Sequence, residues 1–164
     1  MQIELNMKIY LSILFLISAI SLSSCIKEGV DPYVQVQEQL AKDEVVIKKF
    51  IADNNIPALR HETGVYYQIL EPGSGNYVYT VNSKVSTNYK GRLLDGSVFD
   101  QSTSAISFPL GNVIAGWQIG VPLIQKGGKI RLFIPSGYGY GARGSGSIPS
   151  NAVLDFDIEL VDVQ

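Results

Sequence analysis

The stretch that decides the fold of this 164-residue chain is Gly111-Asn112-Val113-Ile114-Ala115-Gly116-Trp117. It contains the only tryptophan, preceded by two β-branched apolar residues and flanked by glycines. This pattern predicts that Trp117 lies on the first turn of a short helix running toward Gly120. A tryptophan in such a place is most often a core residue.

Aromatic residues elsewhere in the chain favour a pocket over a plain core. They fall in strand-like or turn-like segments on both sides of the Trp117 stretch: Tyr89, Phe99, Phe108, Tyr138, Tyr140 and Phe156. Binding sites for small molecules and peptides are typically concave and lined by such side chains. We therefore expect an aromatic pocket with Trp117 at its floor.

The remaining pattern predicts an α+β domain, in which an antiparallel sheet wraps around the short helix. Sixteen glycines and nine tyrosines are typical of a sheet-rich fold. Asp95-Gly96 predicts a hairpin turn. Strands are expected over residues 65–70, 77–81, 85–89 (ending before Gly91), 108–110, 130–135 and 153–163.

The last of these strands has a strict two-residue alternation. Four apolar residues are expected to point inward: Leu154, Phe156, Ile158 and Leu160. The residues between them should point outward, where Asp155 and Asp157 are expected to be solvated charges.

Residues 33–54 have a helical pattern that ends at an Asp-Asn-Asn run followed by Pro57. An apolar stripe runs along this helix through Val36, Leu40, Ile47 and Ile51. The stripe is too short for a sustained coiled coil, which favours packing on the domain over pairing of two chains. Both interpretations remain open on the sequence alone.

The N-terminus is typical of a bacterial lipoprotein precursor. Lys8 precedes an apolar run over residues 9–20, and Leu22-Ser23-Ser24-Cys25 resembles a lipobox. We expect residues 1–24 to be a signal peptide, with Met1 or Met7 as the start, and residues 25–32 to be a tether lipidated at Cys25. An ordinary secretory signal is the alternative, although the only cysteine of the chain has no internal disulfide partner. The lipid would anchor an exported domain to a bacterial membrane.

Composition and motifs argue against several classes of function. The net charge is -2 and there is no basic run, so nucleic-acid binding has no electrostatic support. His61, the only histidine, lies in a polar loop and is expected at the surface, and nothing resembles a metal site. The glycine pattern of residues 139–144 matches a dinucleotide fingerprint, but the sequence that follows cannot begin the required helix. We expect no cofactor.

The sequence resembles the FK506-binding type of peptidyl-prolyl cis-trans isomerases over residues 81–163. Five groups of motifs carry the resemblance, in order: Val85-Ser86-Thr87-Asn88-Tyr89-Lys90-Gly91; Asp95-Gly96-Ser97-Val98-Phe99-Asp100-Gln101-Ser102; Phe108-Pro109-Leu110-Gly111 with Val113-Ile114-Ala115-Gly116-Trp117; Ile134-Pro135-Ser136-Gly137-Tyr138-Gly139-Tyr140-Gly141; and Leu154 with Phe156-Asp157-Ile158-Glu159-Leu160. The resemblance implies a bent antiparallel sheet around a central helix, with the isomerase domain over residues 63–164 and a helical extension over residues 33–62.

The resemblance also implies which residues form the site. The expected catalytic set is Tyr89, Phe99, Asp100, Ile114, Trp117, Tyr140 and Phe156, and the expected pocket walls are Val113, Ile148, Ile106 and Phe108. Trp117 would lie under the proline ring, and the Ile114 N–H would bind a substrate carbonyl. The implied partners are unfolded or proline-containing polypeptides, and an FK506-like macrolide is the implied ligand.

Two features depart from the family pattern, and both lie at the rim of the expected pocket. The loop over residues 144–149 is one residue short, with Ser145 where the family often has histidine, and Ile106 stands at an often aromatic position. The leading hypothesis is isomerisation of Xaa-Pro bonds in exported proteins. The alternatives are a tethered module that binds proline-containing chains with little catalysis, and a structural protein that works through pairing of the 33–54 helix.

Overall fold

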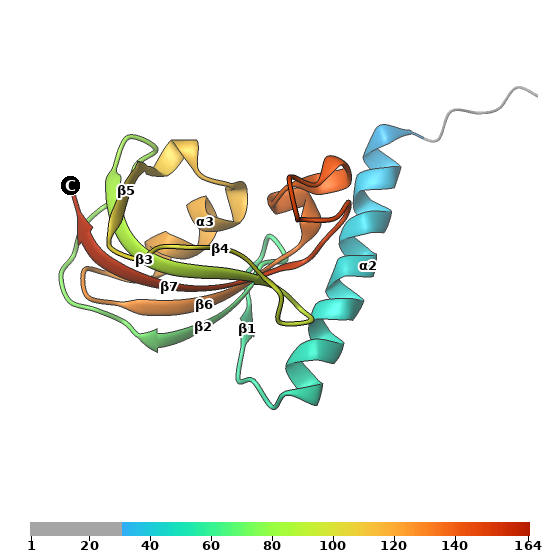
Figure 1. Ribbon diagram of the computed structural model, residues 1–164, viewed down its shortest axis with the longest axis horizontal. Coiled ribbons are helices and arrows are strands. Elements are labelled where there is room, and N and C mark those ends of the chain that lie inside the picture. Colours follow the sequence, from blue (N-terminus) through green and yellow to red (C-terminus); the bar gives the residue numbers. More distant parts are fainter. Residues whose placement is uncertain (1–30) are drawn as a thin grey trace, which may run out of the picture. The chain divides into compact units, whose positions relative to one another are not determined.

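The computed structural model describes residues 31–164, and the expected signal peptide and Cys25 lie outside this range. The element order confirms an antiparallel sheet with a short helix and a preceding long helix (Figure 1). The helices and strands are α2 (Pro32–Asp53), β1 (Leu59–Arg60), β2 (Tyr66–Glu71), β3 (Lys84–Leu93), β4 (Val98–Gln101), β5 (Ile106–Pro109), α3 (Ala115–Gly120), β6 (Lys129–Ile134) and β7 (Leu154–Val163). Short 3-10 turns occupy Leu110–Asn112, Val121–Leu123, Ser136–Tyr138 and Gly141–Arg143.

The sheet places the C-terminal strand at its centre. Its strand order is β1-β2-β6-β7-β3-β4, and β5 pairs with the other end of β3. All the pairings are antiparallel, and Asp95-Gly96 forms the predicted turn between β3 and β4. β3 continues through Gly91, so the expected break there is wrong.

Two glycines let α3 approach the sheet closely. A Cβ atom at Gly116 would lie 2.4 Å from Ile134 Cγ2, and one at Gly120 would lie 2.5 Å from Leu132 Cδ1. The two glycines are four residues apart and therefore share one face of the helix. Trp117 follows the first of them and is 4% exposed. This close packing explains how so short a helix becomes the centre of the core.

β7 confirms the inward prediction and corrects the outward one. Leu154, Phe156, Ile158 and Leu160 are all buried. Asp155, expected to be a solvated charge, is 1% exposed because the guanidinium groups of Arg92 and Arg131 both bind its carboxylate. Asp157 remains half-exposed at the edge of the same charge cluster.

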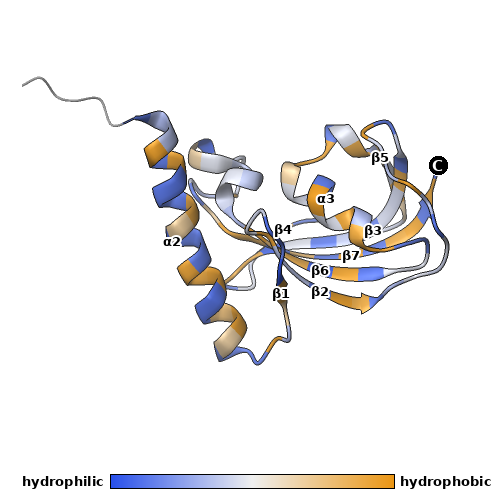
Figure 2. Cartoon of the chain, turned by 180° about the vertical axis from the view of Figure 1, so that it is seen from behind, coloured by the Kyte–Doolittle hydropathy of each residue, from blue (hydrophilic) through white to orange (hydrophobic). Residues whose placement is uncertain are grey.

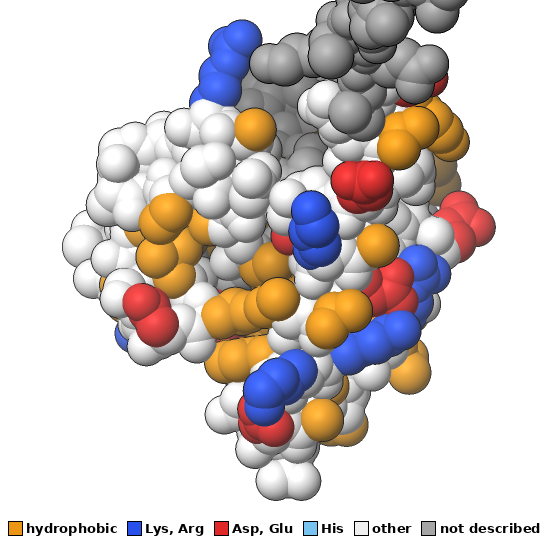
Figure 3. Space-filling view, turned by 90° about the vertical axis from the view of Figure 1, so that its right-hand side faces the viewer, with side chains coloured by type: hydrophobic (Ala, Val, Ile, Leu, Met, Phe, Trp, Pro, Cys, Tyr) orange, Lys and Arg blue, Asp and Glu red, His pale blue; other side chains and the backbone are white. Residues whose placement is uncertain are grey.

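The long helix α2 packs on the domain through a mixed stripe. Ile47 is fully buried beside Phe133, whose ring lies 5.8 Å from that of Phe50. Val36, expected in the stripe, is 53% exposed, and the acid Asp43 is buried instead. Apolar and polar residues alternate along α2 (Figure 2), and charges of both signs mix with apolar groups on the face that it forms (Figure 3).

Two smaller expectations also change. Residues 77–81 form no strand: the backbone N–H and C=O of Tyr77 bond to the Gln125 side chain, and the Tyr79 hydroxyl donates to the Ile124 carbonyl over 2.7 Å. His61 is half-buried in its turn, with Nδ1 at 3.0 Å from the Thr63 hydroxyl. Within residues 31–164, no helix combines the length and the apolar character needed to cross a membrane.

Candidate functional site

An aromatic cavity of about 300 Å³ opens above α3, on the side of the sheet that carries Trp117. Its walls come from four strands, from α3 and from two loops. They are Tyr89 on β3, Asp100 on β4, Phe108 on β5, Asn112, Val113 and Ile114 before α3, Trp117 on α3, Tyr140 in the loop after β6, and Phe156 on β7. Segments far apart in the sequence therefore meet at one site.

Edge-to-face ring contacts form the floor of the cavity. The Trp117 ring lies 5.2 Å from that of Tyr89 and 5.3 Å from that of Phe156, with interplanar angles of 80° and 87°. Phe108 completes the group at 6.2 Å from Trp117. Such T-shaped pairs are favoured electrostatically and hold each ring in one orientation. The floor is thus a preformed apolar surface.

Gly91 allows a further ring to support this floor. A Cβ atom there would lie 2.6 Å from the Phe156 ring and 2.7 Å from the Phe99 ring. Without it, Phe99 packs edge-on against Phe156 at 5.4 Å. Gly91, near the end of β3, therefore serves close packing of side chains and does not break the strand.

One side of the cavity is polar. The Tyr89 hydroxyl donates to Asp100 Oδ2 over 2.8 Å. Burial raises the pKa of Tyr89 to about 12, and the hydrogen bond to Asp100 acts in the same direction. Burial, followed by the charge of Asp100, also raises the pKa of Tyr140. Both phenols therefore remain protonated donors at neutral pH.

Two N–H donors near the cavity have no acceptor within the described part of the chain. Ile114 is the N-cap of α3, and its own N–H makes no hydrogen bond in residues 31–164. The buried Trp117 Nε1 is also unpaired there. Ile114 lines the cavity, so its unpaired N–H is available to a ligand, whereas the enclosed Trp117 Nε1 is not.

Most of the predicted site residues come together in this cavity. Phe99 lies behind the floor, and Ile148 is 7% exposed in the core cluster; neither lines the cavity. Ile106 is 40% exposed on β5 and is likewise absent from the walls. Tyr138 faces a hollow beside α2 instead. Sequence reasoning missed Asn112, although it lies within the quoted stretch next to Val113.

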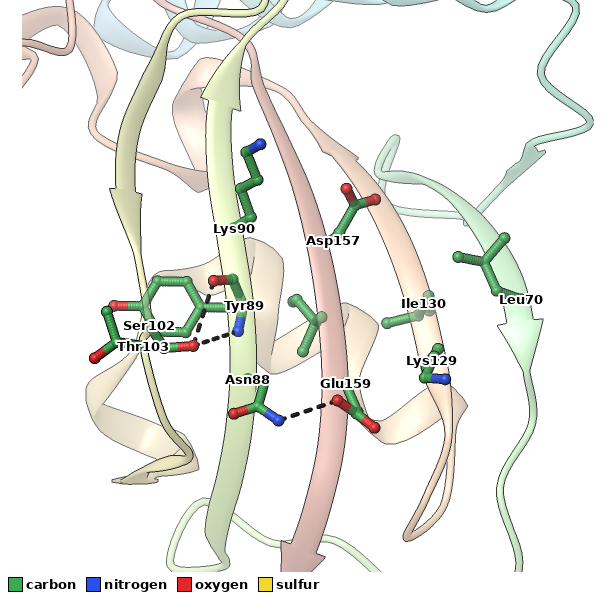
Figure 4. A pocket seen from close by; sticks show the side chains of 11 residues that line it. Leu70, Asn88, Tyr89, Lys90, Ser102, Thr103, Lys129, Ile130, Asp157 and Glu159 are labelled. Atoms are coloured by element: carbon green, nitrogen blue, oxygen red, sulfur yellow. Dashed lines mark hydrogen bonds between the residues drawn. The ribbon is translucent and has the colours of Figure 1, made fainter.

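Larger pockets elsewhere on the described residues have no aromatic floor of this kind. One of about 410 Å³ lies over β3, β7 and β6, where Asn88 donates to Glu159 over 3.0 Å (Figure 4). Lys90, Asp157 and Lys129 also border it, as expected of a charged outer face. Within residues 31–164, no cluster of three or more histidine, cysteine or acidic side chains has the arrangement to hold a metal ion.

The aromatic cavity therefore offers a rigid apolar floor, a phenol–carboxylate pair and a free backbone N–H. These groups are suited to holding a compact apolar ring and the carbonyl groups beside it. The assigned roles of individual residues stay predictions.

The known proteins that this chain resembles in sequence share one description. FkpA of Escherichia coli K12, described as an FKBP-type peptidyl-prolyl cis-trans isomerase, is 41% identical over 127 residues, covering 76% of this chain and 46% of that protein. Buchnera aphidicola (Schizaphis graminum) FkpA is 38% identical over 131 residues, covering 78% and 51%. The chain thus spans about half the length of the curated relatives it matches.

Solved structures agree in fold. The crystal structure of Escherichia coli FkpA is similar with a TM-score of 0.68 at 37% identity, covering 80% of this chain and 64% of that one. A peptidyl-prolyl cis-trans isomerase from Pseudomonas syringae gives a TM-score of 0.65 at 36% identity, covering 78% and 95%.

The family model of the FKBP-type peptidyl-prolyl cis-trans isomerases matches residues 77–161, which is more than half of the chain and includes every residue that lines the aromatic cavity. The chain belongs to the FKBP-type peptidyl-prolyl cis-trans isomerase family.

Proposed function

We propose that the protein catalyses cis-trans isomerisation of Xaa-Pro peptide bonds in other polypeptides, without a covalent step and without a cofactor. The observation that carries this proposal is the rigid aromatic floor around Trp117, bordered by the free N–H of Ile114. A proline ring fits the chemistry of the floor, and the N–H is placed to bind a carbonyl group next to it.

The physical basis is the electronic change on twisting an amide. A planar Xaa-Pro bond is polar because of resonance, and the barrier of about 20 kcal/mol reflects the loss of that resonance. The twisted bond has less charge separation than the planar one. A water-poor aromatic cavity therefore favours the twisted form, which is preferential binding of the transition state.

The fixed hydrogen-bonding groups supply orientation. Ile114 N–H and the Tyr140 hydroxyl border the cavity, and the pair formed by Tyr89 and Asp100 closes its polar side. Holding the flanking chain still while one side of the bond rotates removes an entropic cost. Because each tenfold of rate requires about 1.4 kcal/mol, apolar packing and two or three hydrogen bonds suffice for a moderate catalyst.

A pair of phenylalanine substitutions tests this function. Phe156 and Phe133 are both buried on neighbouring central strands, but Phe156 lines the cavity and Phe133 packs against α2. Phe156→Leu should lower the rate of Xaa-Pro isomerisation at least tenfold in a peptide assay with the full chain. Phe133→Leu should destabilise the fold by a similar amount and leave the rate of folded molecules near that of the unmodified protein.

Asp100→Asn provides a second test, because this exposed side chain bonds within the cavity to Tyr89. Its rate should fall, whereas Asp53→Asn on α2 should have no effect. Unchanged rates in both Phe156→Leu and Asp100→Asn would refute the site. A folded protein that binds proline-containing chains without accelerating isomerisation would instead establish the binding module as the function.

We also propose that the mature protein is a lipoprotein, exported and anchored to a bacterial membrane through Cys25. The support is the sequence Leu22-Ser23-Ser24-Cys25 after a charged and apolar leader. Metabolic labelling with a radioactive fatty acid should mark the protein, and Cys25→Ser should abolish the label. Labelling that persists in Cys25→Ser would contradict this anchor.

An FK506-like macrolide is the proposed inhibitor, since it would occupy the same aromatic cavity. Titration should quench Trp117 fluorescence, because Trp117 is the only tryptophan and forms the floor. Phe156→Leu should weaken the quenching, and Phe133→Leu should not.

A further inference from the structure

Asp43 is an acidic residue buried at the inner face of α2. It is 3% exposed, and its Oδ2 accepts hydrogen bonds from Ser136 N over 2.7 Å and from Ser136 Oγ over 2.6 Å. The other oxygen, Oδ1, accepts from Gln39 Nε2 over 2.7 Å. Burying a carboxylate is costly unless hydrogen bonds compensate the lost hydration, and here three donors bind it. The long helix is therefore fastened to Ser136 by a buried polar clamp.

Ser136 begins the segment that carries part of the aromatic cavity. It is fully buried at the start of the 3-10 turn Ser136–Tyr138, directly after β6 and Pro135. Tyr140, a wall of the cavity, follows four residues later, and Ile148 of the same loop enters the core. The place of Tyr140 thus depends on how the start of this loop is held.

The rest of the loop is held by fewer contacts with α2. A groove of about 470 Å³ separates the first turns of α2 from Gly141, Ala142 and Asn151. The loop folds on itself, with Asn151 N donating to the Gly141 carbonyl over 2.9 Å and Ser145 pairing with Ile148. Beside Asp43, Leu40 of α2 also approaches the start of the loop, since its Cδ2 would lie 3.7 Å from a Cβ atom at Gly137. The contact with α2 is therefore strongest where the loop begins.

We propose that Asp43 is a positioning residue for the isomerase site: by holding Ser136, it fixes the loop that places Tyr140 over the cavity. The helical extension then contributes to substrate binding without touching substrate. This inference rests on the proposed isomerase function. Because a site that is formed in only a fraction of molecules binds proportionately more weakly, loss of the clamp should raise KM more than it lowers kcat.

Asp43→Ala in the full chain is the main test. It leaves the N–H and hydroxyl of Ser136 buried without their acceptor, so KM for an Xaa-Pro peptide should rise about tenfold, with kcat changed by less than about twofold. Amide protons of residues 138–149 should also exchange faster with solvent.

Two matched variants separate positioning from general loss of stability. Asp43→Asn keeps an acceptor for Ser136, and the Gln39 amide can turn to meet the new NH₂ group, so KM should return close to that of the unmodified protein. Ile47→Val loosens the packing of α2 one turn further along but leaves the clamp intact. It should lower the melting temperature without raising KM or speeding exchange in residues 138–149.

The outcomes are distinct. A KM near that of the unmodified protein in Asp43→Ala, or an equal rise in Ile47→Val, would overturn the proposal. Should Asp43→Ala fail to fold, Ser136→Ala carries the test, because it removes the hydroxyl bond and keeps the backbone one. It should raise KM about threefold and speed loop exchange, and the absence of both effects would refute the clamp. If the unmodified protein shows no isomerisation, the proposed function fails, while hydrogen exchange of the loop still tests the role of Asp43.

Discussion

The two faces of the central sheet are built from opposite chemistry, although neighbouring residues of the same strand supply them. Phe156 points into the aromatic cavity, whereas Asp155 on the other face is held by two arginines. The cavity face gains its order from ring contacts and close packing at glycines. The opposite face gains it from buried ion pairs and the packing of α2. Strand alternation thus separates the proposed binding face from a face that serves stability.

Among the variants that test this separation of the two faces, Asp155→Ala should have the largest effect. The change leaves the guanidinium groups of Arg92 and Arg131 without their shared acceptor, in a place where Asp155 itself is 1% exposed. Removing one partner of a buried ion pair costs about 3–5 kcal/mol. Denaturant unfolding should show a loss of this size, and the isomerisation rate per folded molecule should be unchanged.

Asp157→Ala is the matched control for that experiment. Its side chain is 44% exposed and bonds to Arg92 over 2.6 Å. An exposed pair of this kind contributes less than about 1 kcal/mol. If both variants lose the same unfolding free energy, burial does not make Asp155 more important than Asp157. If either variant lowers the isomerisation rate of folded molecules, the two faces of the sheet are not separate in function.

Gly116→Ala tests the packing of the cavity face. The new methyl group would lie 2.4 Å from Ile134 Cγ2 and would push α3 away from β6. Overpacking of this kind costs about 1–3 kcal/mol. Unfolding free energy should fall, and Trp117 fluorescence should change because the helix carries the floor. The double variant with Ile134→Ala should recover part of the fluorescence; if it does not, close packing at Gly116 is not what places Trp117.

Tyr140→Phe should have a smaller effect, confined to activity. The change removes one hydroxyl donor from the cavity wall. A lost hydrogen bond of about 0.5–1.5 kcal/mol corresponds to a decrease in kcat/KM of roughly twofold to tenfold. Tyr138→Phe, beside α2, is the control and should leave kcat/KM unchanged. An equal effect of both changes would remove the distinction between the cavity wall and the α2 side of the loop.

The smallest expected effect concerns pH and the face covered by α2. Hydrogen bonds from Lys48 and then Arg60 lower the pKa of Glu44 to about 2, from an ordinary value of 4.5. A carboxyl whose pKa is lower in the folded state stabilises the fold above its unfolded pKa, and this stabilisation is lost as pH falls. The unfolding free energy should therefore decrease between pH 4.5 and 2, by less than about 1 kcal/mol for each exposed pair. Glu44→Gln should show a shallower decrease over this range, and an identical slope would contradict the assignment.

Periodic and punctuated segments were predictable from the sequence. The alternation in β7, the Asp-Gly turn and the Trp117 helix all have local signals, and the structure confirms them. The aromatic residues of the cavity could be predicted because they belong to family motifs that occur in a fixed order. Asn112 was missed because a polar residue in a turn gives no sign of which way it points.

The errors arose where burial depends on distant partners. Asp155 and Asp43 are charged residues that sequence rules place in solvent, and both are buried because donors from other elements reach them. Gly91 was taken as a strand break because local propensity gives no information about the rings of Phe99 and Phe156 that pack against it. Val36 lies on the apolar stripe, but it borders the groove between α2 and the loop after β6, where no side chain covers it fully.

The central place of β7 has a consequence for folding. This strand pairs with β6 on one side and with β3 on the other, so it alone joins the β1-β2-β6 part of the described sheet to the β3-β4 part. The two parts therefore stay unjoined until β7 inserts between them. Since contacts between distant segments slow folding, the sheet should form in one late step. An intermediate that lacks β7 would expose the strand edges of β3 and β6 that β7 covers in the folded domain.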